Sequence, residues 1–195
     1  MAVSRLSQTS LQNAFQKFNN TWDGVSAVGG MDSLGTVVQS TASSGATFTN
    51  IPQTYQHLQL RFFVKSQASS NDFSLVINGV STGTSYSYHS IKGQSGSLTY
   101  PGYASQPFIY LMKESAEFSG FTSGNICTGI IDFLDYANTN KGKTVKSLLG
   151  TAQNGGGFLK VTSGFYNSSS AITQLDIVNG YNWAAGTQIS LYGIK

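Results

Sequence analysis

The chain has few charged residues. Asp, Glu, Lys and Arg make up 10% of its 195 residues, against about 25% in an ordinary soluble domain. The net charge is +3 and the basic residues are scattered, so we expect no nucleic-acid partner. A surface with so little charge does not attract anionic substrates over long distances. It suits neutral partners, such as carbohydrate or another protein.

Cysteine and long apolar runs are also scarce. The single cysteine, Cys127, cannot form an intramolecular disulfide, and its place in an apolar run predicts a buried core residue. No run approaches the ~20 apolar residues of a membrane span, and the N-terminus lacks the apolar stretch of a secretory signal. We therefore expect no membrane insertion, and folding in a cytosol.

The first 33 residues differ in pattern from the rest. Leu11, Phe15, Phe18 and Trp22 recur at the spacing of one helical face. This spacing predicts a short helix, followed by a glycine-containing linker that ends near residue 33. An isolated helix of this length is marginal in water, so its apolar face needs a partner. That partner is either the chain's own domain or another subunit, to which the helix would be an anchor.

From residue 34 to residue 195, apolar and polar residues alternate with a period of two, which predicts β-strands. The clearest strand is His57–Lys65, and its apolar residues are expected to face a core. Residues 125–136 are more continuously apolar, which predicts a central strand buried on both faces. About ten strands with regular turn signals favour an all-β fold, an antiparallel β-sandwich or jelly roll. We thus expect a short N-terminal helical anchor and linker over residues 1–33 and a β-sandwich domain over residues 34–195.

No set of residues in the sequence forms a catalytic signature. Two separated histidines and one cysteine do not supply the clustered ligands of a metal site. Glycoside hydrolysis usually needs two carboxylates, but Asp132 and Asp135 would point to opposite faces of a regular strand. Pairing between strands could still bring two acids together, although nothing in the sequence favours this. We expect no enzyme activity, no catalytic residue, no cofactor and no bound metal.

Aromatic residues near glycine, serine and asparagine are the remaining candidates for binding. Tyrosine and tryptophan offer a flat apolar face with a polar tip, which suits stacking on sugars or anchoring a protein contact. The alternative for each is that it fills the core. The candidate surface-recognition residues are Tyr100, Tyr103, Tyr166, Tyr181 and Trp183.

Four segments together resemble a known family. They are FTNIPQTYQHLQL (48–60), NGVSTGTSYSYH (78–89), IIDFLDYANTNKGKTVKSLL (130–149) and ISLYGIK (189–195). In their order, and in the terminal Tyr192-Gly193-Ile194-Lys195, they resemble a β-sandwich domain of virion structural proteins of tailed bacteriophages, cyanophages among them. Members of that family occur in tail fibres and head fibres. The resemblance covers about residues 34–195 and carries no catalytic signature.

The resemblance implies a structural protein of the virion, assembled in the host cytoplasm. The favoured hypothesis is a short tail fibre, a homotrimer that attaches to other virion proteins by its N-terminal segment. Its β-sandwich would contact a host cell-surface glycan or protein. The alternative is a head decoration protein or head fibre on the capsid. A glycan-degrading tail enzyme and a cellular lectin are less favoured.

Overall fold

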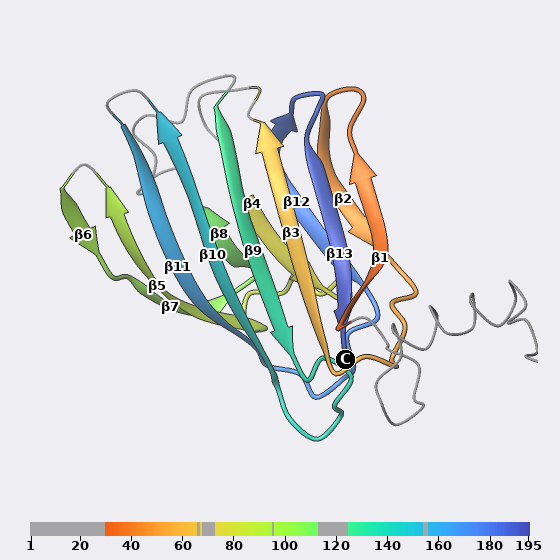
Figure 1. Ribbon diagram of the computed structural model, residues 1–195. Helices are drawn as coiled ribbons and strands as arrows, with labels where there is room; N and C mark the ends of the chain where they lie inside the picture. Colours follow the sequence, from red (N-terminus) through yellow and green to blue (C-terminus); the bar gives the residue numbers. More distant parts are fainter. Residues whose placement is uncertain (1–29, 66, 68–72, 95, 113–124, 154–155) are drawn as a thin grey trace, which may run out of the picture.

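The computed structural model describes residues 30–65, 67, 73–94, 96–112, 125–153 and 156–195. All regular structure in these ranges is β-strand, arranged in two antiparallel sheets (Figure 1). This confirms the predicted all-β antiparallel fold. Leu11, Phe15, Phe18 and Trp22, the predicted anchor, lie outside the described residues. No helix in the described ranges is long and apolar enough to cross a membrane.

The larger sheet has nine strands and the smaller has four. The larger has the order β1-β13-β3-β9-β10-β11-β5-β6, and β7 also pairs with β5. Its strands are β1 (Met31–Val38), β3 (His57–Lys65), β5 (Tyr86–Gln94), β6 (Ser97–Thr99), β7 (Gly102–Gln106), β9 (Ile126–Leu134), β10 (Lys143–Gln153), β11 (Gly156–Tyr166) and β13 (Gln188–Ile194). The smaller has the order β2-β12-β4-β8, with β2 (Ser43–Phe48), β4 (Phe73–Ile77), β8 (Ile109–Met112) and β12 (Leu175–Trp183).

One hydrophobic core joins the two sheets. The alternate apolar residues of β3 face it, as the sequence predicts, and are at most 5% exposed: Leu58, Leu60, Phe62 and Val64. The Phe62 ring lies edge-on to the Phe73 ring of β4, with centroids 4.8 Å apart, and Phe73 lies edge-on to Trp183 at 5.5 Å. These contacts are consistent with a β-sandwich. The finer assignment to a jelly roll stays a prediction.

The first strand begins before the domain boundary that the sequence predicts. β1 starts at Met31 and pairs with β13 along the edge of the larger sheet. Within it, the Asp32 carboxylate accepts hydrogen bonds from Lys195 Nζ at 2.8 Å and from Tyr55 Oη at 3.1 Å. Residues 31–33 therefore belong to the sheet rather than to a linker.

Strand β9 departs from its prediction. Cys127, Ile131 and Phe133 are fully buried, but Ile126 and Leu134 are 40% and 38% exposed. The strand is central in its sheet, as predicted. However, the smaller sheet covers only one face of the larger sheet, so burial on both faces is wrong within the described part of the chain.

Two local features of the sequence are matched in the structure. Asn78 and Gly79 form the turn after β4, with φ values of 53° and 69°, the left-handed conformation that this dipeptide favours in tight hairpins. Cys127 is buried as expected, and this burial raises the pKa of its thiol to about 12.

Candidate contact surface on the nine-stranded sheet

The face of the nine-stranded sheet that points away from the smaller sheet, here called the outward face, is rich in exposed apolar side chains. Leu159 is 59% exposed and Ile91 is 55% exposed. Other exposed apolar residues on this face are Phe63, Leu148, Val161 and Phe165. Single exposed apolar residues are ordinary, whereas a contiguous group of them indicates an interaction surface.

The strand register places three of these side chains in one line with the half-buried Ile130. Ile130 of β9 lies opposite Leu148 of β10, Leu148 lies opposite Val161 of β11, and Val161 lies opposite Ile91 of β5. Directly opposite residues share a face of the sheet and their side chains contact each other. Ile130, Leu148, Val161 and Ile91 therefore form a continuous apolar row across four neighbouring strands.

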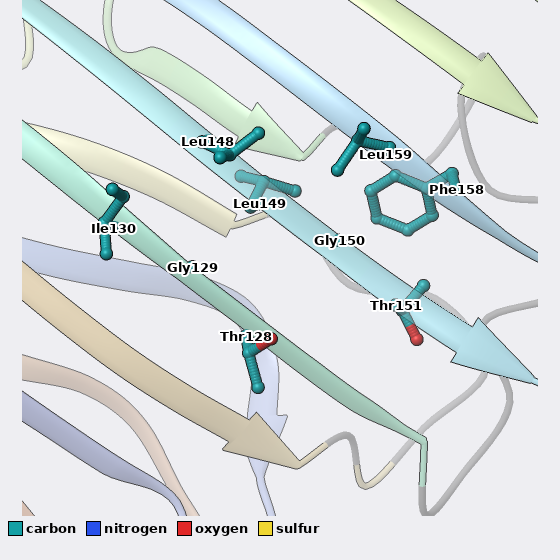
Figure 2. Close-up of a pocket in the computed structure, with 9 residues that line it drawn as sticks. All are labelled: Thr128, Gly129, Ile130, Leu148, Leu149, Gly150, Thr151, Phe158 and Leu159. Atoms are coloured by element: carbon teal, nitrogen blue, oxygen red, sulfur yellow. The ribbon is translucent and has the colours of Figure 1, made fainter.

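A shallow depression of about 470 Å³ lies beside this row. Its lining comes from three adjacent strands, β9, β10 and β11 (Figure 2). At its centre Gly150 lies opposite Thr128 of β9 and Leu159 of β11. The depression exists because Gly150 has no side chain, and a Cβ there would lie 3.1 Å from the carbonyl oxygen of Phe158.

A polar row runs parallel to the apolar row, one step along the strands. Across the sheet it consists of Gln59, Asp132, Lys146, Ser163 and His89. Gln59 Nε2 donates a hydrogen bond to Asp132 Oδ1 at 2.8 Å. Asp132 and Lys146 lie directly opposite each other, so the row carries one acidic and one basic group side by side.

The predicted recognition aromatics are not gathered on one surface. Trp183 and Tyr166 are 1% and 3% exposed, so the prediction that they face a partner is wrong. They pack against Phe73 and against the Tyr86 ring, respectively, because two sheets need large side chains to fill the space between them. Tyr100 is 79% exposed between β6 and β7, and remains a candidate.

The other two candidates lie on separate strands. Tyr103 is half-buried on β7, with its ring centroid 5.0 Å from that of Tyr88. Tyr181 lies in β12, and its side chain is outside the described part of the structure. Since β7 belongs to the larger sheet and β12 to the smaller, Tyr103 and Tyr181 lie on different sheets.

The described carboxylates are each held by a hydrogen-bond donor. Lys195 lowers the pKa of Asp32, and Lys141 lowers the pKa of Asp135, whereas a general acid for glycoside hydrolysis needs a raised pKa. Within the described ranges, no group of three or more His, Cys, Asp or Glu residues could hold a metal. His57 Nδ1 accepts a hydrogen bond from the backbone N–H of Asp135 at 3.0 Å, which gives this histidine a structural role.

Sequence reasoning missed the apolar row, although a signal for it is present. Consecutive apolar pairs interrupt the alternation in four neighbouring strands, β3, β9, β10 and β11: Phe62-Phe63, Ile130-Ile131, Leu148-Leu149 and Phe158-Leu159. Strand β5, which contributes Ile91, has no such pair. Successive side chains of a strand point to opposite faces. Each pair therefore places one apolar side chain in the core and the other outside, and the pairs mark a second apolar surface.

Comparisons with known proteins assign no family. No protein-family model and no curated protein sequence matches the chain. Among solved structures, one of the alginate lyase Aly36B is similar with a TM-score of 0.29 and 11% sequence identity. The alignment covers 80% of this chain and 78% of that chain. At that score the likeness carries no argument about activity.

Proposed function

We propose that this chain is a non-enzymatic structural protein of a phage virion, most simply a short tail fibre. The observation that carries the proposal is the apolar row on the outward face, formed by Ile130, Leu148, Val161 and Ile91. Exposed apolar surface of this kind fits a protein contact, since the cores of interfaces are depleted in charge. The resemblance of residues 34–195 to virion proteins supports the same assignment.

In this proposal the two parts of the chain do different work. The residues before β1, which begins at Met31, attach the protein to other virion proteins. The β-sandwich contacts neighbouring subunits or a glycan or protein of the host surface. The exposed Tyr100 is the aromatic residue best placed for a host contact. The protein is assembled in the host cytoplasm and resides in the particle.

Deletion of residues 1–25 tests the anchor. We expect the truncated protein to be lost from purified particles while its circular dichroism and unfolding midpoint stay those of the full chain. The physical reason is that the deletion stops before Met31, where β1 begins. If the truncated protein is unfolded, or is still present in particles at full occupancy, the anchor is not in this segment.

Imaging of the protein in intact particles separates the tail fibre from the alternative of a capsid decoration protein or head fibre. A tail fibre is present in a few to tens of copies at the tail, whereas a decoration protein covers the capsid in hundreds. Absence from the particle would contradict both. Release of new reducing ends from host polysaccharide would contradict the non-enzymatic assignment.

A further inference from the structure

We propose that a second copy of this chain covers the outward face, in a two-fold face-to-face dimer. The symmetry axis would lie in the interface, run along the strands, and pass between β9 and β10. The inference adds one point to the proposed function: it names a second copy of the chain as the molecule that covers the contact surface. Rotation about the axis sets β10 of the second copy over β9 of the first, and β11 of the second copy over β3. Sheets that pack face to face align their strands within about 30°, which such an axis allows.

The apolar side chains of the face meet each other under this rotation. Ile130 lies opposite Leu148 in the register of β9 and β10, so each copy's Ile130 would meet the other copy's Leu148. One step along the strands, Phe63, Thr128, Gly150 and Leu159 occupy one line across β3, β9, β10 and β11. Phe63 of each copy would therefore meet Leu159 of the other.

The shape of the face is self-complementary at its depression. Thr128 lies directly opposite Gly150 across β9 and β10. After rotation the Thr128 side chain of one copy stands over the hollow at Gly150 of the other. A small side chain set against an empty position allows the two sheets to approach closely, which the packing density of interfaces requires.

The charges of the polar row are self-complementary in the same way. Asp132 and Lys146 lie directly opposite each other across β9 and β10, so the rotation sets each carboxylate against the ammonium of the other copy. The two ion pairs would fix the register of the sheets, because opposite charges across an interface suppress wrong alignments. Gln59 and Ser163, the next residues out in this row, would meet as two neutral polar groups.

Arg61 would meet Val161 of the other copy, and its guanidinium already has a partner. It lies over the Tyr192 ring, 5.2 Å from the centroid, and its Nε donates to Gln59 Oε1 at 2.8 Å. In the dimer the aliphatic part of Arg61 would contact Val161, while the guanidinium keeps its contacts with Tyr192 and Gln59. A homotrimer, by contrast, needs contacts between two different surfaces and would not use this internal symmetry.

Mass measurement of the full chain across a concentration series tests the pairing. We expect the mass of two chains, from light scattering after gel filtration or from sedimentation equilibrium. Leu148→Glu places a charge in the middle of the apolar row and should return the protein to one chain. Val178→Glu is the matched control, because Val178 is similarly exposed, at 41% against 43% for Leu148, but lies on β12 of the smaller sheet.

Charge reversal tests the register of the two copies. Lys146→Asp or Asp132→Lys alone would set like charges against each other, and each should weaken dimerisation by at least about tenfold. The double variant restores opposite charges and should recover most of the affinity. Circular dichroism and the unfolding midpoint of each variant confirm that it is folded.

Several outcomes would overturn the dimer. They are the mass of one chain at all concentrations, the mass of three chains, and the mass of two chains that Leu148→Glu leaves unchanged. A folded double charge-reversal variant that dimerises as weakly as the single reversals would also overturn it. The proposed virion function has its own readout. A protein that is monomeric yet present in particles contradicts the dimer alone, and a dimer absent from particles contradicts the virion function alone.

Discussion

Trp183 contributes one of the largest fully buried side chains of the described core. Its ring fills the space beside Phe73, which in turn contacts Phe62 of the opposite sheet. We predict that Trp183→Ala lowers the free energy of unfolding by about 3–5 kcal/mol, because the substitution leaves a cavity between the sheets. Urea unfolding followed by circular dichroism measures this loss.

Tyr100 provides the control for that measurement. It is 79% exposed, so Tyr100→Ala should change stability by less than about 0.5 kcal/mol. Equal losses in the two variants would mean that Trp183 does not hold the sheets together. A host-binding defect in Tyr100→Ala without a stability change would support the recognition role that the sequence suggests for this residue.

Among elements, the connection from β4 to β5 is held partly by the hydroxyl group of Tyr86. Tyr86 Oη accepts a hydrogen bond from the backbone N–H of Ile77 at 2.9 Å and donates one to the carbonyl of Val80 at 2.8 Å. It thereby fixes the Asn78-Gly79 turn against β5. The Tyr86 ring also stacks on Tyr166, with centroids 5.0 Å apart.

We predict that Tyr86→Phe lowers stability by about 1–3 kcal/mol, because it leaves buried backbone groups without a partner. Thermal unfolding of this variant, with Tyr100→Phe as the exposed control, measures the effect. The ring and its stacking are retained, so the loss belongs to the hydroxyl group. A midpoint equal to that of the parent protein would show that water replaces the two bonds.

The accuracy of sequence-based prediction differs between elements for a physical reason. Strand β3 could be predicted with its bounds, because its alternation, broken only at Phe63, indicates one buried face and one largely polar exposed face. For strand β9 the sequence predicts burial on both faces, which is wrong. The pair Ile130-Ile131 is equally compatible with a strand covered on both faces and with one whose second apolar face is exposed to solvent. Alternation reports which side chains avoid water, but not what covers them.

The candidate surface was harder to predict than the fold. Its apolar row depends on the register of β9, β10, β11 and β5, and residues from 91 to 161 meet in it. Pairing across such separations cannot be read from one sequence. The aromatic candidates failed at Tyr166 and Trp183 because a flanking glycine or asparagine marks a turn, and a residue beside a turn can still point inward.

For the whole molecule, acid should weaken the fold through Asp32 and Asp135. Hydrogen bonds from Lys195 and Lys141 hold the pKa of these carboxyls below the ordinary value of 3.8. The unfolded chain therefore binds protons at a higher pH than the folded chain does. Their contribution to stability is present above pH 3.8 and is lost as the pH falls through the folded-state pKa values.

We predict that Asp32→Asn combined with Asp135→Asn reduces the fall in unfolding midpoint between about pH 5 and pH 2.5. Urea unfolding at a series of pH values measures this difference between the variant and the parent. The parent should lose more stability than the variant over that interval. Parallel curves would show that other carboxyls govern the acid response.

The reactivity of the single cysteine, Cys127, can be used to detect separation of the two sheets. Cys127 points into the core from the central strand β9, and burial raises its thiol pKa to about 12. A thiol reagent can reach it only when the layers part, because the reactive thiolate is both enclosed and scarce while they are closed. The rate of alkylation in the native protein therefore measures how often the two sheets separate. Because Cys127 is the single cysteine, no second thiol group contributes to that rate.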